Sequence, residues 1–209
     1  MSEAEQPKTL GKKLENLWYH YKPFVIIGII AFIVIVICTV QSVTRKKQDV
    51  IVYHAAMQGL TLASQDDFRE SAKLVAEDYN GDGNIVVDFK EDVYVPNEAV
   101  ALGQPTTTDR FNLELAMGEC VVYIMDGSFY RGNRDFMSDL ADIFDVVPSY
   151  AYDEKAFRLG DIPAYDALPG IHDLPEDSYI CLRLKRDGMK DSDYENSKRF
   201  FISFVTYGA

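Results

Sequence analysis

The sequence predicts a membrane-anchored α/β protein whose mostly parallel sheet carries helices on both faces. Two observations lead to this prediction. Residues 24–43 form an uncharged, mainly apolar run, and from residue 49 onward apolar β-branched runs alternate with segments of helical periodicity. Alternating strands and helices typically build parallel βαβ units, whose strands are apolar along their whole length because both faces are covered.

Residues 24–43 are the predicted transmembrane helix. At about 1.5 Å per residue, a helix of this length spans roughly 30 Å, the thickness of a bilayer's hydrocarbon core. Its Ile and Val favour strands in water, but in lipid a lone segment satisfies its backbone hydrogen bonds only as a helix. A cleaved signal peptide is the alternative, because Val40-Gln41-Ser42 is a tolerable cleavage pattern. The length of the run and the basic residues after it favour an uncleaved anchor.

A leader, residues 1–23, and a basic linker, residues 44–48, flank the predicted span. Trp18, Tyr19 and Tyr21 cluster where aromatic rings prefer the headgroup level, and leucines recur before them at helical spacing, so we expect an amphipathic juxtamembrane helix. Charge alone barely separates the two orientations, because basic residues lie on both sides: Lys8, Lys12, Lys13, Lys22, Arg45, Lys46 and Lys47.

Residues 49–209 have the length of one domain with one sizeable core. This part of the chain is strongly acidic, in keeping with a net charge of -12 for the whole sequence. Binding of nucleic acid depends on Lys and Arg that neutralise phosphates. We therefore expect no nucleic-acid partner.

The first half of the domain is predicted as strand, helix, strand. Residues 49–57, DVIVYHAAM, form a short apolar run typical of a buried strand. Ser64, followed by acids, is expected to cap a helix. Residues 80–83, Asn-Gly-Asp-Gly, end that helix, and residues 84–89 form the second strand.

The same cycle is predicted to repeat in the second half. Thr108 caps a short helix that ends at Gly118, where glycine suits a left-handed position. Residues 120–125 are the third strand, and Asn133 opens another helix. Beyond it the chain is irregular from Pro148 to Asp177. A fourth strand at residues 179–185 then precedes a closing helix, whose apolar side carries Tyr194, Phe201, Phe204 and Val205.

The order strand, helix, strand, capped helix, followed by LELAMGECVVYIMDGSFY, resembles the first lobe of extracellular solute-binding proteins of the type II periplasmic fold. In that superfamily a helix ending in a Gly-acid pair precedes a strand that presents a polar and aromatic cluster. The matching residues here are Gly118, Glu119, Val121 to Met125, Asp126 and Phe129. The resemblance covers about residues 49–145. It implies a non-enzymatic binding module outside the plasma membrane, with the N-terminus in the cytoplasm.

Nearly the whole chain also resembles uncharacterised single-pass proteins of Gram-positive gut bacteria. They share the basic-aromatic leader, one span, a DYNGDG turn and a strand like LPEDSYICLRL, and this resemblance implies no particular activity. Solute-binding proteins close two lobes around a ligand, whereas residues 49–209 hold one lobe. The alternative function is therefore a structural subunit that contacts another membrane protein and has no small-molecule ligand.

In an open parallel sheet, ligands bind outside the carboxyl ends of the strands. In this chain that edge follows the first and third predicted strands, where Tyr130 and Arg131 offer a ring and a cation beside Asp126. The predicted ligand- or partner-binding residues are His54, Gln58, Asp126, Ser128, Phe129, Tyr130 and Arg131. Loop residues without a ligand are the alternative.

The DYNGDG turn has the spacing of a calcium loop, with oxygen-bearing side chains at positions 1, 3, 5 and 7 and glycine at position 6. Phe89 occupies position 12, where such loops have Glu, and Asp88 falls one place early. The candidate calcium ligands are Asp78, Asn80, Asp82, Asn84 and Asp88. The alternative is a plain helix-to-strand turn, which Asn-Gly and Asp-Gly form readily.

No other cofactor and no enzymatic activity are predicted. The sequence has no G-x-S-x-G elbow, Walker A loop or Rossmann glycine fingerprint. His20, His54 and His172 are scattered over the leader, a strand and a loop, so they predict neither a zinc cluster nor a catalytic pair. Cys120 and Cys181 fall on predicted strands: a disulfide requires neighbouring strands outside the cell, and buried free thiols are the alternative.

Overall fold

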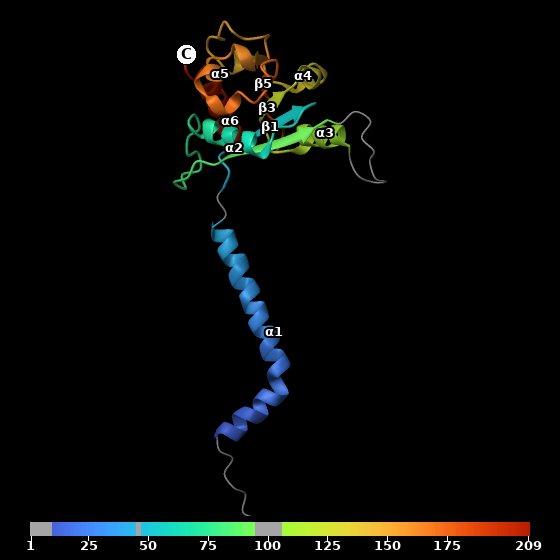
Figure 1. Ribbon diagram of the computed structural model, residues 1–209, viewed down its shortest axis with the longest axis vertical. Helices are drawn as coiled ribbons and strands as arrows, with labels where there is room; N and C mark the ends of the chain where they lie inside the picture. Colours follow the sequence, from blue (N-terminus) through green and yellow to red (C-terminus); the bar gives the residue numbers. More distant parts are fainter. Residues whose placement is uncertain (1–9, 45–46, 95–105) are drawn as a thin grey trace, which may run out of the picture. The chain divides into compact units, whose positions relative to one another are not determined.

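The computed structural model describes residues 10–44, 47–94 and 106–209. The chain divides into two compact units, residues 1–46 and 47–209 (Figure 1). The first nine residues of the predicted leader, together with Arg45 and Lys46 of the predicted linker, lie outside the described residues.

The described part of the first unit is a single helix, α1 (Leu10–Thr44). The predicted leader helix and the predicted span are thus continuous, with Pro23 inside the helix. Proline removes a backbone hydrogen bond and crowds the preceding turn, and α1 bends in its N-terminal part in Figure 1. Residues 21–40 have a mean hydropathy of 3.1 and are long enough to cross a membrane. A membrane anchor and an N-terminal signal sequence both fit this property.

The described part of the second unit contains a five-stranded mixed sheet in the order β2-β1-β3-β5-β4. β1 pairs in parallel with β2 and β3, whereas β5 is antiparallel to both β3 and β4. The α/β class is therefore confirmed, and β5 alone of the described strands runs against the others. The strands are β1 (Val50–Ala56), β2 (Val87–Val93), β3 (Val122–Met125), β4 (Ala156–Arg158) and β5 (Tyr179–Leu182).

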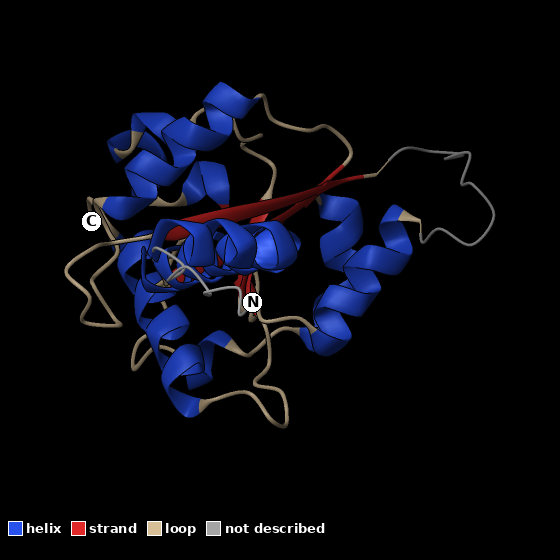
Figure 2. Ribbon diagram, turned by 90° about the horizontal axis from the view of Figure 1, so that it is seen from below, coloured by secondary structure: helices blue, strands red, loops and turns tan. Residues whose placement is uncertain are grey.

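Helices cover both faces of this sheet, as predicted (Figure 2). On one face, Phe68 of α2 and Phe204 of α6 pack in the same core cluster as Val52 of β1. On the other face, Phe111 of α3 and Tyr130 of α4 share a cluster with the β-strand tyrosines. The helices are α2 (Leu62–Lys73), α3 (Thr107–Met117), α4 (Gly127–Asn133), α5 (Pro163–Ala167) and α6 (Asp191–Thr206).

Short 3₁₀ turns fill much of the region between α4 and β5. They are η1 (Arg134–Phe136), η2 (Leu140–Asp142), η3 (Leu159–Asp161) and η4 (Pro169–Ile171). The sequence predicted no strand between Pro148 and Asp177, and β4 lies there. β4 has three residues, too few to show the apolar alternation by which a strand is recognised.

Two helix starts differ from the prediction because other residues cap them. Thr61 rather than Ser64 caps α2, and its hydroxyl oxygen accepts the Ser64 N–H at 3.1 Å. Thr106 rather than Thr108 caps α3 through a capping box with Asp109. Gly118 ends α3 in an extended conformation with φ of -71°, so the predicted left-handed position is wrong.

The helix predicted to open at Asn133 is also wrong, because α4 ends there. Its true start is set by Asp126, whose carboxylate accepts the N–H groups of Ser128 and Phe129 at 3.0 and 3.1 Å. These bonds satisfy two of the free N–H groups at the start of a helix.

Candidate functional site

Asp126 lies where the sheet order reverses, since β2 and β3 lie on opposite sides of β1. The carboxyl ends of β1 and β3 meet there, which is the usual ligand position in such sheets. Besides capping α4, the Asp126 carboxylate accepts the Met57 N–H at 2.9 Å, and the Asp126 N–H donates to the Ala55 carbonyl at 3.1 Å. Asp126 therefore ties the loop after β1 to the loop after β3.

Tyr130 and Arg131, the ring and the cation predicted beside Asp126, lie in different surroundings. Tyr130 is buried, stacks on Tyr179 with 4.9 Å between ring centroids, and donates its hydroxyl to Asp153 at 2.7 Å. Burial and the neighbouring Asp153 raise the pKa of Tyr130. Arg131 is exposed, as is Ser128, whose hydroxyl donates to Asp126 at 2.6 Å.

Phe129 is half-buried and packs on Phe111 of α3, with ring centroids 5.0 Å apart. Its ring thus belongs largely to the contact between α4 and α3. Of the residues predicted after β3, Arg131 and Ser128 are the ones that present their side chains to solvent.

His54, at the end of β1, is completely buried. Its Nδ1 lies 2.8 Å from Oε1 of Glu91 on β2, and its Nε2 has no hydrogen-bond partner among the described residues. Glu91 also accepts the Leu60 N–H at 2.9 Å and the Gln65 amide at 3.0 Å. Burial alone would raise the pKa of Glu91, but the hydrogen bonds from His54, Leu60 and Gln65 outweigh it and lower the pKa.

These bonds clamp the loop at residues 58–60 against β2. A side chain on Gly59 would place its Cβ 2.6 Å from Cγ2 of Val93, so a larger residue there would have to displace the Val93 side chain. His54 therefore contacts the same Glu91 carboxylate that accepts the Leu60 N–H of this loop.

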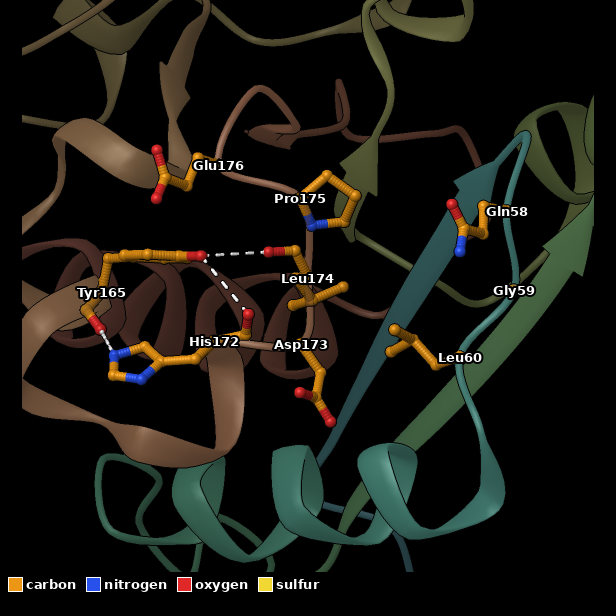
Figure 3. A pocket seen from close by; sticks show the side chains of 9 residues that line it. All are labelled: Gln58, Gly59, Leu60, Tyr165, His172, Asp173, Leu174, Pro175 and Glu176. Carbon is orange, nitrogen blue, oxygen red and sulfur yellow. Dashed lines mark hydrogen bonds between the residues drawn. The ribbon is translucent and has the colours of Figure 1, made fainter.

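The clamped loop forms one wall of a pocket of about 280 Å³ (Figure 3). The other wall comes from a segment more than a hundred residues later in the sequence. Gln58 is the predicted site residue that lines this pocket. The complete lining is Gln58, Gly59, Leu60, Tyr165, His172, Asp173, Leu174, Pro175 and Glu176.

The far wall is fixed to α2. The Gly170 N–H donates to the Ser71 hydroxyl at 3.0 Å, and a Cβ on Gly170 would lie 2.1 Å from the Asp67 carbonyl oxygen. Only glycine allows η4 to come this close to the helix. The near wall is thus held by the Glu91 carboxylate of β2, and the far wall by its close approach to α2.

Hydrogen bonds inside the far wall determine where the Tyr165 hydroxyl and the His172 ring carry their protons. The Tyr165 hydroxyl donates to the Leu174 carbonyl at 3.2 Å, and His172 Nε2 lies 2.6 Å from the Tyr165 carbonyl (Figure 3). A carbonyl oxygen only accepts, so Nε2 of His172 carries the proton. Burial and the charges of Glu176, Asp166 and Asp173 raise the pKa of Tyr165.

In the predicted calcium loop, the carboxylates bind backbone N–H groups. Asp78 accepts the N–H groups of Gly81, Asp82 and Gly83 at 2.7, 3.2 and 2.8 Å. Asp88 instead accepts the Gln48 amide at 2.8 Å. Among the described residues, no group of three or more His, Cys, Asp or Glu side chains is arranged to hold a metal ion.

The remaining two residues of the predicted loop belong to the same hydrogen-bonded turn. Asn80 accepts the Asp82 N–H at 2.9 Å, and the Asn84 N–H donates to the Asp82 carboxylate at 2.8 Å. The described contacts are those of a tight turn. It lies beyond the helix, because α2 ends at Lys73 and not at residues 80–83, and β2 begins at Val87 rather than at residue 84.

Cys120 and Cys181 are buried free thiols. β3 and β5 are neighbours, but Cys181 stands opposite Tyr123 in the register, three positions from Cys120. Burial raises the pKa of both thiols, which keeps them protonated and weakly nucleophilic.

The sequence predicted Gln58 in one wall of the pocket and none of the residues in the other wall. The signal that was present is charge: between Arg158 and Arg183 the chain has five acids and no Lys or Arg. No protein-family model matches the chain, and neither a curated protein nor a solved structure shows significant similarity to it. The pocket and the apolar helix α1 are therefore the structural features that bear on function.

Proposed function

We propose that this chain is a single-pass protein of a bacterial plasma membrane whose C-terminal domain is a non-enzymatic module that binds a small solute. Residues 24–43 anchor it in the lipid bilayer, the N-terminus is cytoplasmic, and residues 49–209 face the outside. The domain corresponds in this proposal to a single lobe of the type II solute-binding kind.

The pocket beside the carboxyl end of β1 is the observation that supports solute binding. It adjoins the sheet edge at which α/β domains usually hold ligands, and it combines an aromatic ring with several polar groups. Its volume of about 280 Å³ suits a compact solute. Rigid walls also reduce the entropy lost when a ligand binds.

A purely structural subunit would be expected to expose an apolar patch for its partner. The irregular segment after Pro148 is the region in which such a patch was expected. Most of its large apolar side chains are instead buried in the core: Phe157, Leu159, Ile162, Leu168, Ile171 and Leu174. The described side chains of this segment thus build the domain and one pocket wall.

Solute binding can be tested by thermal unfolding of the full chain in detergent micelles, against a panel of amines, amino acids, sugars and carboxylates. We expect at least one class to raise the unfolding temperature of the wild type, because a ligand that binds only the folded state stabilises it. Gln58→Trp, which fills the pocket from an exposed position, should abolish that rise. A panel without effect would favour the structural-subunit alternative.

Anchoring and orientation need a separate experiment on intact cells. We expect the chain to stay in the membrane fraction after alkaline carbonate washing, and added protease to remove the domain without lysis. Digestion only after lysis would place the domain inside the cell. Release of a shortened chain into the medium would identify the apolar helix as a cleaved signal sequence.

A further inference from the structure

The pocket carries negative charge on its far wall. Asp173 and Glu176 line it, neither forms an ion pair with another described residue, and no Lys or Arg is among the lining residues. A neighbouring anionic solute would be repelled, whereas a cation would gain Coulomb energy from both carboxylates.

The hydrogen-bonding groups of the pocket also favour a cationic ligand. The Tyr165 hydroxyl uses its proton on a backbone carbonyl, so its oxygen remains as an acceptor. In the neutral ring of His172, the proton on Nε2 leaves Nδ1 as an acceptor too. The pocket is therefore rich in acceptors, and a ligand that donates several N–H bonds would match it.

Several backbone donors in the walls are already used. The Leu60 N–H donates to Glu91 at 2.9 Å, the Leu174 N–H to the Ile171 carbonyl at 3.0 Å, and the His172 N–H to the Pro169 carbonyl at 3.2 Å. An anionic ligand needs such donors, and these three are committed elsewhere. The aromatic ring of Tyr165 adds a surface that attracts cations.

We propose that this pocket binds a small organic cation with at least one primary or secondary ammonium group. An ammonium group donates to the carboxylate of Glu176, on the side of the Tyr165 ring, or to that of Asp173, which lies toward α2, and the carbon chain lies toward Leu60 on the opposite wall (Figure 3). This inference rests on the proposed function and narrows its ligand class.

Three probes with the same five-carbon chain test the charge requirement: 1,5-diaminopentane, 1,5-pentanediol and glutarate. They are titrated calorimetrically into the full chain in detergent micelles at low salt. We expect the diamine to bind at least about tenfold more tightly than the diol, the change in affinity that corresponds to about 1.4 kcal/mol. Glutarate should not bind, and added salt should weaken the diamine.

The isosteric variants Asp173→Asn and Glu176→Gln remove the charges and keep the shape. Each should weaken the diamine several-fold, and the double variant should bring it to the level of the diol. Asp187→Asn is the matched control, because it removes one exposed negative charge that does not line the pocket. Unfolding curves without ligand establish that each variant is folded.

Equal affinities for diamine and diol would overturn the cation proposal, as would an equal loss of affinity in the Asp187→Asn control. Binding of the diol or glutarate without the diamine would leave solute binding standing and refute the ligand class. A wild type that binds none of these probes and no member of the wider solute panel would refute both.

Discussion

Arg183 is a buried cation that is bound by backbone carbonyls. Its side chain is 2% exposed, and its guanidinium donates to the carbonyls of Glu114, Leu115 and Gly118 at 2.9, 2.8 and 3.0 Å. These carbonyls lie at the C-terminal end of α3, where the helix dipole is negative and carbonyls lack partners within the helix. One side chain thus joins the end of β5 to the end of α3.

Replacing Arg183 by Met should destabilise the domain strongly, because the carbonyls would stay buried without donors. We expect a loss of roughly 3 kcal/mol in the free energy of unfolding, measured by urea denaturation. Lys185→Met is the control, since Lys185 is exposed and pairs with Asp191 at the surface. A similar loss in both variants would contradict the role given to Arg183.

Glu91 makes stability depend on pH. Its pKa is lowered in the folded state, from an ordinary value of 4.5, so its stabilising contribution is complete above that pH. The contribution is lost as the pH falls through the lowered folded value. Glu91→Gln should therefore cost about 1–3 kcal/mol at neutral pH, and the difference from the wild type should shrink in acid.

Denaturation curves across the acid range measure this difference. Glu195→Gln, on the exposed side of α6, should leave the pH profile unchanged. The difference in the free energy of unfolding between Glu91→Gln and the wild type could instead stay constant from neutral pH to strong acid. That result would show that Glu91 is not the titrating group.

Among the structural elements, the turn between α2 and β2 depends on two carboxylates, those of Asp78 and Asp49. Asp78 accepts three successive N–H groups, and Gly81 and Gly83 have positive φ of 71° and 81°. This geometry reverses the chain within a few residues. Asp49 helps from the start of β1 by accepting the N–H groups of Tyr79, Asn80 and Val86 at 3.0, 3.1 and 2.9 Å.

Asp78→Ala should cost about 1–3 kcal/mol, because it removes an acceptor shared by three backbone donors. Asp82→Ala should cost less, since Asp82 accepts one backbone N–H. We expect the same unfolding temperature in millimolar calcium and in EDTA. A rise with calcium that Asp78→Ala abolishes would instead support the calcium loop.

At the level of elements, the sequence predicted what depends on local pattern and missed what depends on distant contacts. β1, β3, α2 and α6 carry apolar runs or periodic apolar faces, and these were recognised. Gly118 was wrongly given a left-handed conformation because nothing local shows that Arg183, at the end of β5, binds the carbonyls at the end of α3. Likewise, Gln58 could be predicted as a site residue because it comes directly after a predicted strand. Tyr165 could not be predicted, because it lines the same pocket only through the packing of η4 on α2.

For the molecule as a whole, the division into two units predicts that the domain folds without α1. All core residues of both clusters lie between Val50 and Val205, within the second unit. α1 therefore supplies nothing to the described core of the domain.

A chain that begins at residue 47 should be soluble without detergent and should unfold cooperatively at the same temperature as the domain in the full chain. Circular dichroism and size-exclusion chromatography measure this. The matched control is the same truncated chain carrying Phe204→Ala, which removes a fully buried ring and should lower the unfolding temperature. Aggregation of the unmodified truncated chain would show that the domain needs α1.

The place of β5 in the sheet has a consequence for how the protein is made. β5 lies between β3 and β4, yet it comes after both of them in the sequence, and α6 follows it with Phe200, Phe201 and Phe204 of the core. The five-stranded sheet cannot form completely while the ribosome still holds these residues. We therefore expect the domain to complete its fold only after residue 205 has left the ribosome, because β5 joins β3 to β4 and the rings of α6 belong to the core.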